Sequence, residues 1–167
     1  MNIFLPYENN VEESVRTLDD KRLIKQILET YQLLNNAIEE ENGIEIKGYK
    51  NHPIYKHYKG SIGFLSYYGY ECCYEYWTRF QKSHRLAPFF MGVKGLYPNH
   101  YHFTPFYMEG SIGQPNYIRT TENVSALYQA KLITKWENDK VKPKWTNREV
   151  PQFYLTYKES KNGRTNQ

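Results

Sequence analysis

The chain has 167 residues, a net charge of +4 and a pI near 8.9. This length suits a single domain with its own hydrophobic core, and no apolar run is long enough to cross a membrane. The two cysteines, Cys72 and Cys73, are neighbours, so we expect no disulfide framework. The first residues lack the basic region and long apolar stretch of a signal peptide. These features favour a cytoplasmic protein in a reducing compartment.

Aromatic residues are abundant, with 17 Tyr, 8 Phe and 3 Trp. Most of them are expected to pack in the core, because tyrosine can bury its ring and still satisfy its hydroxyl group. Aromatic rings also stack on bases, so the same excess is compatible with a nucleotide site. The segment from Lys131 onward carries nine Lys and Arg against four Asp and Glu, which favours an anionic partner.

The first half of the chain predicts an extended segment followed by a long helix. Asn2–Leu5 is a short apolar run stopped by Pro6. Residues 7–16 are polar and predict a loop. Thr17 is a predicted N-cap for a helix that ends near residue 41. The apolar positions of this helix follow helical spacing and are Ile24, Ile27, Leu28, Tyr31, Leu34 and Ile38.

The second half predicts two further long helices, at residues 62–84 and 120–136, separated by a loop at 86–118. A turn-rich linker at 47–53 precedes the first of them. A late aromatic segment is expected to pack back on the helices, and its residues are Trp145, Pro151, Phe153 and Tyr154. The predicted fold is mainly α: a compact single-domain bundle of about three main helices, with a short N-terminal extended segment and long loops. We expect one globular domain at 1–157 and a disordered polar tail at 158–167.

A polar stripe follows one face of the first long helix. At 100° per residue its members fall within a sector of about 80°, and they are Arg22, Lys25, Glu29, Gln32 and Asn36. Lys25 and Gln32 lie within one turn of the Glu29 carboxylate, which favours its ionised form. The pattern is also that of an ordinary solvated helix face. Additional features are needed to make it a site.

Other groups of polar residues have simpler interpretations. Glu71, Glu75 and Arg79 are spaced as a structural ion-pair ladder on the second helix. Five histidines invite a metal hypothesis, but neither carboxylates nor thiols complete a recognised set of ligands. They are His52, His57, His84, His100 and His102. We therefore predict no metal site and no cofactor.

Two segments resemble the pyrimidine-dimer DNA glycosylase (endonuclease V) family of phage and bacterial proteins. Leu18–Glu29 is similar to the family's helix, in which an acidic catalytic residue follows an aspartate by nine positions; Asp20, Arg22 and Glu29 take the three matching places. The run Gly48–Pro53 is similar to the aromatic-Lys-x-x-Pro turn that follows this helix. The resemblance covers about residues 1–85.

The resemblance implies a DNA glycosylase and AP lyase that acts on damaged pyrimidines. In that family the N-terminal amine attacks C1′ and forms a Schiff base, and the glutamate assists sugar opening and β-elimination. An α-amine titrates at about pH 7.7–8.0, so a fraction is neutral near pH 7. Asn2 favours retention of Met1, so the implied catalytic groups are Glu29 and Met1. The implied substrate- or nucleotide-binding residues are Asp20, Arg22, Lys25, Gln32, Tyr49, Lys50 and His52.

Two alternatives stay open at this point. One is a non-catalytic phage protein on the same scaffold that sequesters a nucleotide immune signal in the host cytoplasm. Here Arg22, Lys25 and Lys50 would hold phosphates and tyrosines would stack on the base, in a pocket that a homo-oligomer often forms. The other is a structural or regulatory partner with no site. The expected partner is therefore DNA or a nucleotide, and no membrane.

Overall fold

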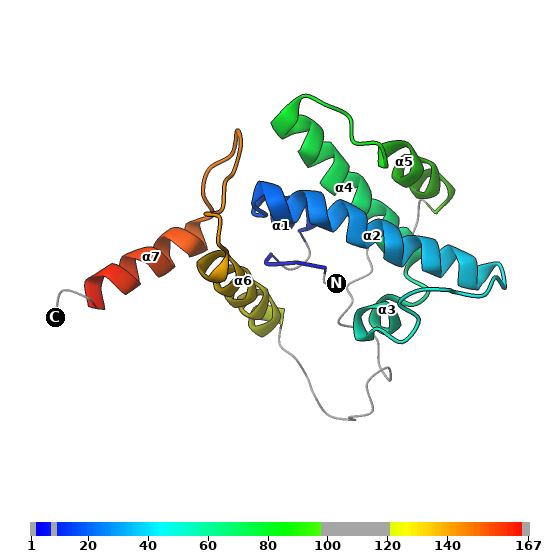
Figure 1. The fold of residues 1–167 in the computed structure, drawn as a ribbon, viewed down its shortest axis with the longest axis horizontal. Coiled ribbons are helices and arrows are strands. Elements are labelled where there is room, and N and C mark those ends of the chain that lie inside the picture. Colours follow the sequence, from blue (N-terminus) through cyan, green and yellow to red (C-terminus); the bar gives the residue numbers. More distant parts are fainter. Residues whose placement is uncertain (1–2, 8–9, 98–120, 165–167) are drawn as a thin grey trace.

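The computed structural model describes residues 3–7, 10–97 and 121–164, except for the side chains of 121–124 and 164. These residues form seven helices and no strand (Figure 1). The helices are α1 (Val11–Arg16), α2 (Asp20–Glu41), α3 (Pro53–Tyr58), α4 (Ile62–Phe80), α5 (Ala87–Leu96), α6 (Thr121–Asn138) and α7 (Gln152–Arg164). The prediction of a mainly helical fold with about three main helices is confirmed, since α2, α4 and α6 have 22, 19 and 18 residues.

The two longest helices, α2 and α4, form the centre of the fold, and α2 crosses in front of α4 in Figure 1. Leu23 and Ile27 of α2 and Leu65, Tyr68 and Cys72 of α4 are all completely buried. Full burial of a large apolar side chain contributes about 1.5–3 kcal/mol. This pair of helices is therefore the main source of hydrophobic stabilisation around the polar groups described below.

Helix α5 packs closely on α4 at one glycine. A Cβ atom built on Gly69 would lie 2.0 Å from Cε1 of Phe90, a fully buried ring. Any side chain at position 69 would overlap this ring, so the close approach of the two helices requires glycine here.

The last two helices are joined to the N-terminal end of α2 by an aromatic cluster. The Trp136 ring lies 5.1 Å from that of Trp145 and 4.9 Å from that of Tyr154. The Trp136 indole donates to Asp19 Oδ1 at 2.7 Å, and the Trp145 indole donates to the Thr17 carbonyl at 2.8 Å. The prediction that the late aromatic segment packs back on the helices is confirmed.

Two short helices, α1 and α5, lie in segments predicted as loop, and a third, α3, begins at the last residue of the predicted linker. Local capping explains α1 and α3. The Asn10 side chain accepts from the Glu13 N–H at the start of α1, and His52 Nδ1 accepts from the Ile54 N–H at the start of α3. The prediction that Thr17 begins the long helix is wrong. Thr17 ends α1, and α2 begins after Asp19.

The buried face of α2 is also rotated relative to the predicted one. Ile24 and Leu28, both predicted to be inward, are 46% and 45% exposed, whereas Arg22, Glu29 and Asn36 of the polar stripe are buried. Segments distant in sequence contact this side of the helix: Phe4 bonds to Gln26, Trp136 bonds to Asp19 and Gly48 bonds to Asn36. Contacts with distant parts of the chain leave no trace in local periodicity, which is why the pattern misplaced the face.

Two further observations concern the ends and the surface of the fold. Residues 158–164 were expected to begin a disordered tail, but they are the last part of α7. A membrane span is likewise not found among the described residues, since none of their helices is both long and apolar enough to cross a bilayer.

Candidate active site

Glu29 lies on α2 at the edge of the core. The residue is only 8% exposed. Its Oε2 accepts a hydrogen bond from Gln26 Nε2 at 3.1 Å, and its Oε1 lies 3.5 Å from Lys25 Nζ. The Lys25 side chain is 64% exposed, against 11% for that of Glu29. Of these two groups, the Gln26 amide is buried and the Lys25 ammonium reaches into solvent.

The N-terminal segment lies against the same helix. Ile3, Phe4 and Leu5 are buried. The Phe4 N–H donates to Gln26 Oε1 at 3.2 Å. The Tyr68 hydroxyl lies within hydrogen-bonding distance of both the Phe4 carbonyl and Gln26 Oε1, at 3.0 and 2.9 Å. The side chain of Gln26 thus connects the start of the chain to Glu29.

Three tyrosines from different helices form one wall of this region: Tyr58 of α3, Tyr68 of α4 and Tyr128 of α6. Burial, together with the neighbouring hydroxyl of Tyr128, raises the pKa of Tyr58 well above its usual value. Burial also raises the pKa of Tyr68. The Tyr128 ring lies 6.2 Å from that of Phe4 and 5.6 Å from Lys131 Nζ. Tyr58 and Tyr68 therefore stay protonated near neutral pH and serve as neutral hydrogen-bonding groups.

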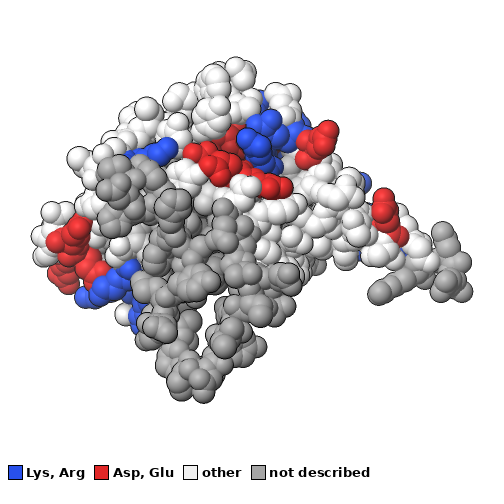
Figure 2. Space-filling view, turned by 180° about the vertical axis from the view of Figure 1, so that it is seen from behind, with Lys and Arg blue, Asp and Glu red and all other residues white. Residues whose placement is uncertain are grey.

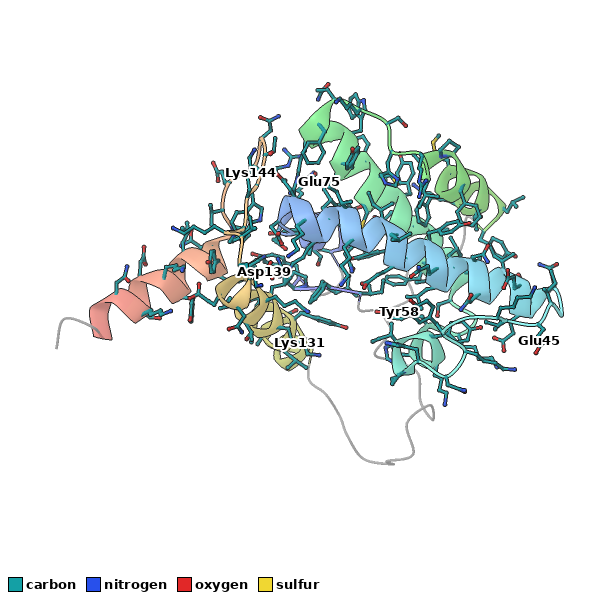
Figure 3. All side chains as sticks on the ribbon, viewed as in Figure 1. Glu45, Tyr58, Glu75, Lys131, Asp139 and Lys144 are labelled. Atoms are coloured by element: carbon teal, nitrogen blue, oxygen red, sulfur yellow. The ribbon has the colours of Figure 1, made fainter. Side chains whose placement is uncertain are left out.

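Figure 3 shows how the labelled groups are distributed. Tyr58 lies on α3 beneath α2, and Lys131 lies on the neighbouring α6, while Asp139 lies near the start of α2. On the face shown in Figure 2, most of the described acidic and basic side chains lie in groups that contain both signs. This face therefore offers no strip of purely basic charge among the described residues.

Asp20 and Arg22, both predicted to contact substrate, lie in a second set of polar contacts at the start of α2. Arg22 Nη1 donates to Asp19 at 3.0 Å and Nη2 lies 2.9 Å from Asp139 Oδ2. The Asp20 carboxylate accepts from the Thr146 hydroxyl at 2.7 Å and from Arg79 at 3.1 Å. These bonds join α2 to the segment after α6. Asp20 and Arg22 therefore lie together in the first turn of α2, about two turns before Glu29.

The remaining predicted residues gather near the second half of α2. Asn36 Nδ2 donates to the Gly48 carbonyl at 2.7 Å and so fixes the turn that follows the helix. In that turn the ring of Tyr49, 53% exposed, lies 6.2 Å from the ring of His52. Lys50 is exposed and Gln32 is half-buried. Tyr49, Lys50 and His52 therefore come together, separated along α2 from Glu29.

Met1 and two of the histidines, His100 and His102, lie outside the described residues. In the part of the chain that the structure describes, no three His, Cys, Asp or Glu side chains are placed to hold a metal ion. Cys72 and Cys73 are buried free thiols. Burial raises the pKa of Cys73 to about 12, so this thiol is a poor nucleophile near neutral pH.

A surface hollow lies apart from Glu29, between α1 and the residues that lead into α7. It has a volume of about 840 Å³. Acidic and basic residues of both elements line it, among them Glu12, Arg16, Arg148 and Glu149. Its charges are mixed and Arg148 is paired with Glu75 at 2.8 Å. We do not include this hollow in the candidate site.

Sequence reasoning missed three residues of the site: Phe4, Gln26 and Tyr68. Gln26 precedes Glu29 by three positions, which places the two side chains on the same side of a helix. That spacing was a usable signal. The roles of Phe4 and Tyr68 depend on contacts across 22 and 42 residues of chain, for which the sequence offered no signal.

Comparison with known proteins identifies a family for the first half of the chain. The family model described as pyrimidine dimer DNA glycosylase matches residues 1–87, more than half of the 167 residues. The match includes α2, the turn after it and α4. No curated protein and no solved structure shows significant similarity to the chain. The chain therefore belongs to the pyrimidine dimer DNA glycosylase family.

Proposed function

We propose that this protein is a DNA glycosylase and AP lyase that acts on damaged pyrimidines, with Glu29 as the catalytic carboxylate and the Met1 α-amine as the nucleophile. The observation that carries the proposal is the contact of the N-terminal segment with α2. Phe4 is bonded to Gln26, and Gln26 is bonded to Glu29. Two residues span at most about 7 Å, and this short reach from Ile3 supports the proposal that the Met1 amine works beside α2.

The proposed reaction uses the two groups in sequence. The neutral amine forms a bond to C1′, the glycosidic bond breaks, and its electron pair leaves with the pyrimidine, which takes up a proton. Loss of a proton from nitrogen and protonation of O4′ open the sugar and give the imine. Glu29 then accepts a proton from C2′ while the C3′–O bond breaks and the 3′-phosphate leaves with its electron pair. Removal of such a base typically costs 10²–10⁴-fold in rate.

Lys25 and the exposed turn residues suit contacts with the phosphates of DNA. The Lys25 side chain is 64% exposed beside Glu29, and Lys50 is exposed beside Tyr49. Lysine and arginine contacts with phosphates position a duplex without reading its sequence. The damaged nucleotide must leave the stack to reach a carboxylate that is only 8% exposed.

The test is covalent trapping with borohydride, which reduces the imine to a stable secondary amine. We expect the wild-type protein to give an adduct with an abasic duplex and with a dimer-containing duplex. Glu29→Gln should lower the rate of strand cleavage by at least about 100-fold and keep the fold. Acetylation of the N-terminal amine should abolish the adduct. An adduct that survives acetylation, or strand cleavage unaffected by Glu29→Gln, would contradict the assignment of these two groups.

A further inference from the structure

Gln26 occupies an unusual place for an amide side chain. It lies one turn before Glu29 on α2 and is only 1% exposed. Its oxygen and its nitrogen bond to different parts of the protein: Oε1 to the N-terminal segment and Nε2 to Glu29. Any buried amide needs hydrogen-bond partners. The informative feature of Gln26 is therefore which groups its oxygen and its nitrogen bind.

The chemistry of the neighbours fixes the orientation of the amide. The backbone N–H of Phe4 can only donate, so the group that faces it at 3.2 Å must be the amide oxygen. An ionised carboxylate can only accept, so the group that faces Glu29 at 3.1 Å must be the amide nitrogen. Both contacts require the same orientation. The amide cannot turn over without breaking both hydrogen bonds.

The Tyr68 hydroxyl adds a third constraint. It lies 2.9 Å from Gln26 Oε1 and 3.0 Å from the Phe4 carbonyl. Tyr68 is fully buried on α4, so Gln26 and the N-terminal segment are held by a side chain of the core. A residue held by three partners in the core keeps Glu29 in one position relative to residues 3–5.

We propose that Gln26 is the positioning residue of the active site, which sets the Glu29 carboxylate and the N-terminal segment at a fixed distance from each other. This inference rests on the proposed function, because the N-terminal amine and Glu29 are the groups it aligns. Gln26 would touch neither substrate nor the reacting atoms. It would act through its hydrogen bonds to Glu29 and to the backbone of Phe4.

Gln26→Glu separates positioning from folding. A glutamate at 26 still offers an oxygen to the Phe4 N–H and the Tyr68 hydroxyl, but it has no N–H for Glu29. Two carboxylates then face each other and resist ionising together. The control is Gln129→Glu on α6. Gln129 is half-buried, and its amide donates to the Pro6 carbonyl at 3.0 Å. It holds the N-terminal segment without contact to Glu29 in the bonds described.

The first measurement is a carbon-13 NMR titration of the Glu29 side-chain carboxyl carbon, assigned with the Glu29→Gln variant. We expect the titration midpoint to move upward in Gln26→Glu and to stay in place in Gln129→Glu. This readout requires no catalysis. If both variants leave the midpoint unchanged, Gln26 does not hold the Glu29 carboxylate and the proposal is overturned.

The second measurement is the rate of strand cleavage on an abasic duplex at pH 5.5 and 7.5, because Glu29 acts as the base in the cleavage step. The ratio of the Gln26→Glu rate to the wild-type rate should fall about tenfold from the higher to the lower pH, because the shared proton blocks the base. The Gln129→Glu ratio should stay constant. If the ratio of variant rate to wild-type rate is the same at both pH values for both variants, Gln26 has only a structural role. Failure of the wild type to form any adduct would instead overturn the proposed function, and the titration would still decide the Gln26–Glu29 contact.

A double variant, Gln26→Glu with Glu29→Gln, guards against loss of the fold. It restores the hydrogen bond in the reverse direction, with the amide now at position 29. We expect thermal stability to return close to that of the wild type while strand cleavage stays as low as in Glu29→Gln. Recovery of cleavage would show that the carboxylate works from either position, which contradicts a fixed geometry.

Discussion

Two buried carboxylates on the central helices, Glu75 and Glu29, have opposite kinds of partner. Glu75 is bonded to the Arg79 guanidinium at 2.7 Å and to Arg148 at 2.8 Å. Arg79 itself has a fully buried side chain, and it also donates to the Leu18 and Arg16 carbonyls. The Glu29 carboxylate is bonded to the buried Gln26 amide and lies 3.5 Å from Lys25, whose side chain is 64% exposed. The cations beside the first carboxylate are held by the fold, whereas the lysine beside the second extends into solvent.

This difference shows that the exposed fraction of a carboxylate does not by itself indicate its role. Glu75 is 4% exposed and Glu29 is 8% exposed, so exposure does not separate them. The partners do. Glu75 is bonded to Arg79, which also donates to the Leu18 and Arg16 carbonyls, so this carboxylate joins α4 to the residues around α1 and α2 and its role is structural. Glu29 lies instead at the edge of the core beside a lysine side chain that is mostly exposed.

The largest effect on stability is expected from Arg79→Met. Methionine keeps the apolar volume but removes every hydrogen bond of the guanidinium, and Asp20 and the Leu18 carbonyl lose a buried donor. Removing one partner of a buried ion pair typically costs about 3–5 kcal/mol. Urea unfolding followed by circular dichroism measures this loss. A cost below about 1 kcal/mol would mean that the network around Glu75 is not what joins α4 to the start of α2.

A smaller effect, dependent on pH, is expected at Glu71, one turn before Glu75. Burial and the neighbouring Glu12 raise the pKa of Glu71 to about 6. At Glu75 burial acts in the same direction, but hydrogen bonds from Arg148 and Arg79 outweigh it and lower the pKa. A raised carboxyl pKa lowers stability as pH rises from about 4.5, the usual value, to about 6.

Glu71→Gln should therefore remove this loss. Because Glu71 is partly exposed, we expect a gain of only about 1 kcal/mol above pH 6.5 after allowance for solvent screening. Below pH 4.5 wild type and variant should have equal stability. Urea unfolding at pH 4 and pH 7 measures both values, with circular dichroism as the signal. A gain of the same size at both pH values would rule out titration of Glu71 as its source.

The smallest effect on stability is expected from Lys25→Gln, which tests the open side of the comparison. Exposed ion pairs contribute about 0–1 kcal/mol, so the free energy of unfolding should change by less than about 0.5 kcal/mol. Binding to an abasic duplex, measured by fluorescence anisotropy, should weaken and lose part of its salt dependence. Lys21→Gln is the matched control, since Lys21 is also 64% exposed and pairs with Asp139. Equal weakening by both variants would indicate general charge rather than a contact beside Glu29.

Much of the fold followed from local patterns, and the rest depended on contacts across the chain. The spacing of Glu75 and Arg79 predicted their ion pair, which the structure contains. Arg148, the third member, lies 73 residues from Glu75 and gave no signal. The short helices α3 and α5 carry a proline in their first turn. Such a proline is compatible with both a turn and a helix start, so the sequence alone did not distinguish the two.

The candidate site was predicted in outline only. The resemblance selected Glu29 from an otherwise ordinary polar stripe. The rotation of α2 was not predictable, because its polar side contacts distant segments: Phe4 bonds to Gln26 and Trp136 bonds to Asp19. Asp20 and Arg22 matched the family's spacing, yet their visible bonds are to Thr146, Arg79, Asp19 and Asp139.

The burial of Ile3–Leu5 has a practical consequence for making the protein. A purification tag joined directly ahead of these residues must leave the molecule past α2 and Glu29, since Phe4 is bonded to Gln26 and Tyr68. It would crowd the proposed site and replace the amine at its start. The other end is safer for a tag, because Glu159 and Lys161 on the last turns of α7 are exposed. Assays of an N-terminally tagged preparation would therefore report on a blocked molecule.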